Sequence, residues 1–125
     1  MPWPGEPNAE EIEPLPRWAM VALAGRCARR VLPLYALASP YVSPEQIKTM
    51  QDAVELVERA AALGGGDFQV AWRLFYAACP SAVNQFGSAI AAAVEVVYET
   101  RRLDRANKVC HLITVGSRHS EFCHL

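Results

Sequence analysis

The chain has 125 residues, 52% of them hydrophobic, so a single domain can bury a core without the help of metal ions or disulfide bonds. Twelve Lys and Arg residues against thirteen Asp and Glu residues leave a formal charge of -1, which argues against a protein that coats nucleic acid. Twenty alanines and only seven glycines favour helices, because Ala loses no side-chain entropy in a helix and Gly loses the most backbone entropy. We therefore predict a soluble, globular, all-α protein.

Residues 1–16 are predicted to be an extended, acidic, proline-rich segment. They hold five of the nine prolines and four glutamates, with no Lys or Arg. The N-terminus lacks the basic residues and apolar stretch of a secretory signal, and the four cysteines are scattered rather than arranged as a disulfide framework. A cytoplasmic location is the expectation that follows.

A first helix is predicted over residues 17–38, with Pro16 where a first helical residue would stand. Pro33 lies inside this segment and removes the hydrogen bond to the carbonyl of Arg29, so we expect the helix to kink or restart there. The apolar stripe of this helix consists of Met20, Leu23, Ala24, Cys27, Val31, Leu34 and Tyr35.

The second helix, up to Leu63, has the clearest start and stop signals in the chain. Ser43 is the predicted cap, Pro44 the first helical residue and Gln46 the reciprocal partner of a capping box. The glycines 64–66 supply a left-handed cap at the other end. The predicted core stripe is Ile47, Met50, Val54, Val57 and Ala61.

Two more helices are predicted, from a cap at Asp67 to Ala78 and from about residue 81 to 108, giving a bundle of four or five helices. Leu74 to Val94 carries no charge over twenty-one residues, but the Pro80 region divides it, which favours two soluble helices over a membrane span. The cations at 101–105 are expected at the C-terminal end of the last helix. Residues 109–125 form a predicted tail, whose first seven residues suit a short strand, a continued helix or a docked segment.

Arg26, Arg29 and Arg30 form the first candidate binding feature, because residues three and four apart share a helical face. Their guanidinium groups make a cationic ridge that could hold a carboxylate-rich or phosphate-bearing partner. The alternative is that they face water or pair with the chain's own acids, for which the candidates are Glu55, Glu58, Glu95 and Glu99.

The second candidate is the aromatic cluster of Trp72, Phe75 and Tyr76. Most of it is expected in the core, but Trp72 and Tyr76 share a face at a spacing of four, so one edge could stay exposed as an anchor for a partner protein.

A third candidate is a zinc site in the tail, which contains all three histidines and two cysteines. Zinc is bound by thiolate and imidazole ligands in fours, although the spacing here matches no well-defined finger. The alternative is a loosely ordered tail. The ligands would be drawn from Cys110, His111, His119, Cys123 and His124.

No catalytic motif is found, and we predict a protein that is not an enzyme. The glycines at 64–66 lack the Lys and Ser or Thr of a phosphate loop, and no GxSxG elbow occurs. The carboxylate pairs Glu55/Glu58 and Glu95/Glu99 share helical faces, but solvated faces explain them better than a desolvated cleft does.

Residues Arg26 to Tyr35, with the sequence RCARRVLPLY, followed after a connector by the amphipathic helix around residues 53–58, resemble a family of small helical immunity proteins of bacterial polymorphic toxin systems. The similarity covers about residues 18–63, and its motif is short and apolar. The resemblance implies a cytoplasmic protein without enzymatic activity that neutralises a toxin by binding it.

The function predicted from the sequence is therefore binding of a protein partner, most specifically occlusion of a cognate bacterial toxin domain. No nucleic acid partner, membrane span or cofactor is expected. The alternative is a small zinc-binding regulatory module that uses Cys110, His119, Cys123 and His124. The residues predicted to bind the protein partner are Arg26, Arg29, Arg30, Trp72 and Tyr76.

Overall fold

A computed structural model describes residues 8–38, 41–65, 68–78, 82 and 84–123, and for residues 68 and 116–123 it describes the backbone alone. These residues contain helices and no strand, so the predicted all-α bundle is confirmed. The six helices of this part of the chain are α1 (Ala9–Ile12), α2 (Arg17–Ala38), α3 (Pro44–Leu63), α4 (Phe68–Ala78), α5 (Gln85–Tyr98) and α6 (Arg102–Cys123).

Helix α2 has the predicted bounds and continues through Pro33 without a restart. Pro33 and Arg29 both lie on the exposed side of α2. Water can therefore hydrate the Arg29 carbonyl that loses its helical hydrogen bond to the proline, and packing of the opposite side holds the helix together. The buried side carries Met20, Ala24, Cys27, Val31 and Tyr35 of the predicted stripe.

Helix α3 forms from the local signals that the sequence contains. The Ser43 hydroxyl accepts a hydrogen bond from the Gln46 backbone N–H at 3.1 Å, and the Gln46 side chain accepts one from the Ser43 N–H at 2.8 Å. Both capping-box bonds are therefore made, as predicted. Gly64 ends the helix with a φ of 65°, a left-handed conformation that favours glycine.

The prediction that residues 1–16 are extended is wrong for residues 9–12, which form a short helix. The Asn8 side chain caps α1 by accepting a hydrogen bond from the Glu11 N–H at 2.9 Å. Ile12 is buried, and α1 packs against α6. The N-terminal segment therefore contributes a buried side chain to the core. Residues 1–7 lie outside the described part of the chain.

The prediction of one helix over residues 81–108 is also wrong, because the segment forms two helices, α5 and α6, separated by a short turn. Helix α5 starts later than predicted, after the cap residue Asn84, and ends at Tyr98. The cations at 101–105 consequently stand at the start of α6 and not at the end of a helix. The negative charges of Glu99 and Asp104 complement the positive N-terminal end of α6. Asp67 and residues 79–81, where the sequence predicted a cap and a break, fall outside the described residues.

Residues 109–123 continue α6 and do not form a separate tail. Val109, Leu112 and Val115 are buried against the rest of the bundle. Of the three structures that suited residues 109–115, the chain adopts the continued helix, and this helix is docked. The bundle therefore extends beyond the predicted boundary at residue 108.

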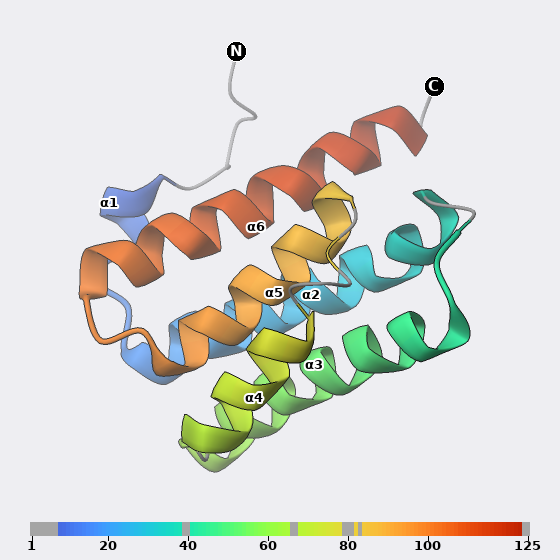
Figure 1. Cartoon of the computed structure of the whole chain (residues 1–125). Helices are drawn as coiled ribbons and strands as arrows, with labels where there is room; N and C mark the ends of the chain where they lie inside the picture. The colour runs from blue at the N-terminus through green and yellow to red at the C-terminus, as the bar shows by residue number, and fades with distance from the viewer. Residues whose placement is uncertain (1–7, 39–40, 66–67, 79–81, 83, 124–125) are drawn as a thin grey trace.

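Helix α5 is the centre of the bundle and packs against α2, α3, α4 and α6 (Figure 1). In Figure 1, α6 crosses on one side of α5, and α3 and α4 lie on the other. Its small buried residues, Ala89, Ala91 and Ala93, allow these neighbours to approach closely. The predicted split of the uncharged stretch 74–94 is confirmed, and none of the described helices is long and apolar enough to cross a membrane.

Candidate protein-binding surface

An aromatic patch joins α4 to the C-terminal end of α5. The Trp72 ring meets those of Tyr76 and Tyr98 edge to face, with centroids 4.8 and 5.7 Å apart. Phe75 lies 6.2 Å from both Tyr76 and Tyr98. These separations and angles are those that aromatic pairs prefer, so the four rings support one another. We call Trp72, Phe75, Tyr76 and Tyr98 the aromatic patch.

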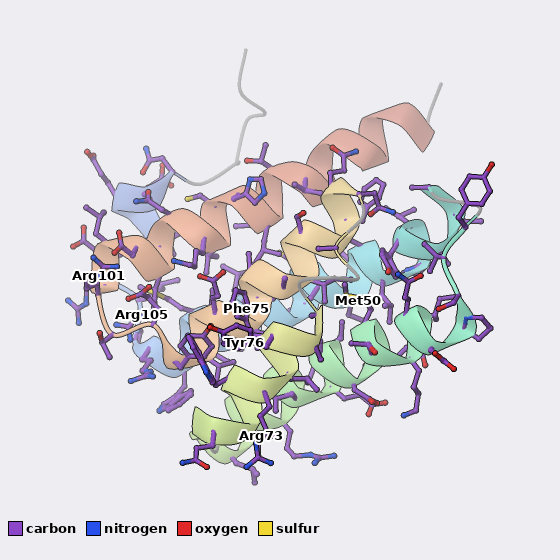
Figure 2. The ribbon with its side chains drawn as sticks, in the orientation of Figure 1. Met50, Arg73, Phe75, Tyr76, Arg101 and Arg105 are labelled. Atoms are coloured by element: carbon purple, nitrogen blue, oxygen red, sulfur yellow. The ribbon has the colours of Figure 1, made fainter. Side chains whose placement is uncertain are left out.

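The outer edge of the aromatic patch is exposed to solvent. Trp72 is 40% exposed and Tyr76 59%, whereas Phe75 and Tyr98 are half-buried beneath them. Figure 2 shows Phe75 and Tyr76 on the part of α4 that adjoins α5. The exposed edge that the spacing of Trp72 and Tyr76 predicted is therefore present, while its role in binding remains a prediction.

Helix α4 leaves several large apolar side chains partly exposed. Only Ala71 and Ala78 are fully buried among its described side chains, and Val70 is 42% exposed. A helix normally turns its large apolar residues to the core and its small or polar residues to water. Helix α4 leaves Val70, Trp72 and Tyr76 exposed as well as its polar residues, so it presents an apolar surface of the kind that marks an interaction site.

A groove of about 480 Å³ lies on the other side of α4, between α4 and α3. Its floor is apolar, and part of its rim is charged by Asp52, Glu55 and Arg59. We call it the α3–α4 groove. No local sequence pattern predicts this groove, because residues of three helices, α3, α4 and α5, line it. The apolar lining includes Leu56, Ala60, Leu63, Val70, Leu74 and Val97.

The arginine ridge of α2 is exposed but is not uniformly free. Arg29 donates both from Nε, at 3.2 Å, and from Nη2 to the Glu58 carboxylate of α3. Arg26 and Arg30 are exposed and have no ion pair within the described residues. Helix α3 packs against both α2 and α4, and so lies between the helix that carries the arginine ridge and the helix that carries Trp72 and Tyr76.

Two other arginines, which the sequence analysis did not select, bind the C-terminal end of α5. Arg17 of α2 donates to the Val97 carbonyl at 2.7 Å, and Arg105 of α6 donates to the Glu99 carbonyl at 3.2 Å. Cations there complement the negative end of the helix dipole and satisfy carbonyls that lack helical partners. Burial lowers the pKa of Arg105, and the nearby charges of Arg17 and Arg102 lower it further.

Glu95 and Glu99 also have a structural explanation. Lys108 of α6 lies 3.5 Å from the Glu95 carboxylate and 3.3 Å from that of Glu99, which ties α6 to α5. The Arg101 backbone N–H donates to Glu99 at 3.1 Å. This bond, together with Lys108, lowers the pKa of Glu99. The carboxylates therefore act as ion-pair partners and a helix cap.

We expect the contacts of Glu99 to make the free energy of unfolding depend on pH. Because the pKa of Glu99 is lower in the folded chain, its contribution is present above the ordinary value of 4.5 and is lost as the pH falls through the folded value. Urea unfolding of the wild type and of Glu99→Gln at about pH 6 and about pH 3 measures the effect. The two proteins should differ in stability at the higher pH and converge at the lower one; a constant difference contradicts the assignment.

Three of the predicted zinc ligands, Cys110, His119 and Cys123, lie on α6, and the zinc site stays a prediction. Cys110 and His119 are nine residues apart in this continuous helix, which separates them by about 13 Å of rise and half a turn of rotation. No group of three or more His, Cys, Asp or Glu side chains that could hold a metal ion occurs in the described part of the chain. His124 and the side chains of His119 and Cys123 lie outside that part.

Comparison of the chain with models of protein families, with curated proteins and with solved structures finds no match.

Proposed function

We propose that this protein is a non-enzymatic helical domain that binds a partner protein through the exposed aromatic patch of α4. The observation that carries the proposal is the partial exposure of Trp72 and Tyr76 on half-buried Phe75 and Tyr98. Trp and Tyr are the residues most enriched at energetic centres of protein interfaces, since they bury a large area for few rotatable bonds.

The packing of the aromatic patch against Tyr98 of α5 favours tight binding. The edge-to-face contacts between α4 and Tyr98 of α5 hold the rings in place before a partner arrives. A preorganised anchor loses less side-chain entropy on binding than a mobile one does. The patch therefore provides the rigid, partly apolar centre that a stable interface needs.

In its more specific form, the proposal is that the protein acts in the cytoplasm as an immunity protein and occludes a toxin domain. The resemblance of residues 18–63 supports this form, with Arg26 and Arg30 as exposed cations that could contribute at the rim of the interface. Occlusion requires surface complementarity and no catalytic group, which agrees with the structural roles found for Glu95, Glu99 and Glu58.

The test is co-expression of tagged protein with the product of the adjacent gene, followed by capture and by a survival assay of a sensitive host. Tyr76→Ala is expected to weaken binding about tenfold or more, because it removes an exposed anchor at little cost to the core. Tyr41→Ala is the matched control, since Tyr41 is 93% exposed and lies outside the patch.

The outcomes separate the two levels of the proposal. A captured partner that is lost with Tyr76→Ala but kept with Tyr41→Ala supports binding through the patch. Equal capture by both variants places the interface elsewhere. Capture without protection of the host removes the immunity function, and the absence of any stable partner removes both levels.

A further inference from the structure

Tyr98 is the residue of α5 on which the aromatic patch rests. Its ring meets those of Trp72 and Phe75 edge to face, with centroids 5.7 and 6.2 Å apart. Tyr98 is also the last residue of α5, and the Glu99 backbone that follows it is extended, with a ψ of 125°. The position of the patch therefore depends on the last turn of a helix, where carbonyl groups lack N–H partners and where helices fray.

Two arginines bind the backbone on either side of Tyr98. Nη2 of Arg17 donates to the Val97 carbonyl at 2.7 Å, and Nη1 of Arg105 donates to the Glu99 carbonyl at 3.2 Å. These carbonyls belong to the residues immediately before and immediately after Tyr98. Figure 1 shows the start of α2 and the start of α6 beside the C-terminal end of α5. We call Arg17 and Arg105 the arginine clamp.

The side chains of the arginine clamp make no other hydrogen bond in the described part of the chain, and Nε of each is buried without a partner. Arg105 is the only charged residue that is buried among the described ones. Burial of a cation is costly unless its charge is compensated. The carbonyls at the negative end of α5 supply that compensation, so each bond restrains the guanidinium and the carbonyl together.

The other polar contacts at this end of α5 act on a side chain. Lys108 and the Arg101 N–H bind the Glu99 carboxylate at 3.3 and 3.1 Å. Arg17 binds the peptide group that precedes Tyr98, and therefore holds a part of the chain that the carboxylate contacts do not.

We propose that Arg17 and Arg105 are positioning residues of the protein-binding surface: by holding the carbonyls on both sides of Tyr98, they fix the ring against which Trp72 and Phe75 pack. The role of the clamp rests on the proposed function, and it makes α2 and α6 determinants of the patch geometry although neither helix carries any of its rings. A preorganised patch binds more tightly because less ordering remains to be done when the partner arrives. Loss of the clamp should therefore weaken binding without removing a ring of the patch.

The test is fluorine NMR of full-length protein labelled with fluorotryptophan, measured well below the unfolding midpoint, with the Trp72 signal assigned from a Trp72→Phe variant. Arg17→Met and Arg105→Met keep an apolar stem and remove the donors. Each is expected to shift and broaden the Trp72 signal, because the Tyr98 ring is no longer held at a fixed position beside it. Arg102→Met is the matched control, since Arg102 is an exposed arginine on the same helix as Arg105, and it should leave the signal unchanged.

Two further variants separate positioning from a general loss of stability. Arg17→Lys keeps a cationic donor and should restore most of the wild-type Trp72 signal. In a Tyr98→Ala background, Arg17→Met should still lower the unfolding midpoint but should leave the Trp72 signal unchanged, because the ring that the clamp positions is absent.

Binding supplies a second readout when a partner has been captured. Arg17→Met and Arg105→Met are expected to bind it about two- to tenfold more weakly, which is the cost of ordering one or two side chains on binding. Arg102→Met should bind it as the wild type does.

Three NMR results would overturn the proposal: an unchanged Trp72 signal in both clamp variants, an equal change in Arg102→Met, or a further change caused by Arg17→Met in the Tyr98→Ala background. The NMR measurement needs no partner. It can fail while binding through the aromatic patch is found, and it can succeed while no partner is captured, so the failure of the clamp is distinguishable from the failure of the proposed function.

Discussion

Replacement of Leu112 by alanine is expected to lower the free energy of unfolding by about 3 kcal/mol. Leu112 has no exposed surface and lies on the part of α6 that packs against the core, where removal of buried methyl groups loses hydrophobic transfer free energy and leaves a cavity. A residue in a loosely ordered tail would show almost no effect. The variant therefore measures directly whether residues 109–115 belong to the bundle.

Leu103→Ala is the matched control, because Leu103 lies on the same helix and is 50% exposed. Its loss is expected to change stability by no more than about 0.5 kcal/mol. Equilibrium urea unfolding followed by circular dichroism measures both variants. If Leu112→Ala is no less stable than Leu103→Ala, α6 does not dock as described.

Replacement of Asn84 by alanine is expected to cost about 2 kcal/mol. The side-chain oxygen Oδ1 of Asn84 accepts hydrogen bonds from the Phe86 and Gly87 N–H groups, both at 3.0 Å, and so caps α5. Its amide nitrogen donates to the Tyr35 carbonyl of α2 at 3.2 Å. Alanine removes a helix cap worth about 1 kcal/mol and a tertiary hydrogen bond of similar value.

Two comparison variants divide these contributions. Asn84→Asp keeps the capping oxygen and loses the donor to Tyr35, so its stability should lie between those of the wild type and Asn84→Ala. Asn8→Ala removes the cap of the short helix α1. Among the described residues the Asn8 side chain bonds only within its own helix, to the Glu11 N–H, so its loss should cost less. Thermal unfolding ranks all three, and an Asn84→Ala protein as stable as Asn8→Ala shows that the bond to α2 contributes nothing.

Some helix ends can be predicted from the sequence and others cannot, for a physical reason. Ser43 and Gly64 were assigned correctly because capping acts between backbone groups a few residues apart, and no distant residue is needed to complete it. The break after Tyr98 was missed because nothing local requires it. There the chain turns where Arg17 and Arg105, which are far apart in sequence, can reach the last carbonyls of α5.

The same difference between local and tertiary features applies to the candidate binding surface. A spacing of four placed Trp72 and Tyr76 on one face of a helix, and the structure keeps that face partly exposed. The sequence could not place Tyr98 of α5 beneath them, nor form the α3–α4 groove, because each depends on how separate helices pack. The same holds for Arg29, whose pairing with Glu58 across twenty-nine residues depends on the contact between α2 and α3.

By itself, the sequence determined the all-α class, the bounds of α2 and the capped ends of α3, since helix propensity, apolar spacing and capping are properties of short segments. Only the tertiary structure decided that α6 docks on the core, that its continuous backbone keeps Cys110 apart from His119, and that α4 leaves its aromatic edge in solvent. These features depend on which surfaces the other helices have already covered, and no short segment of sequence contains that information.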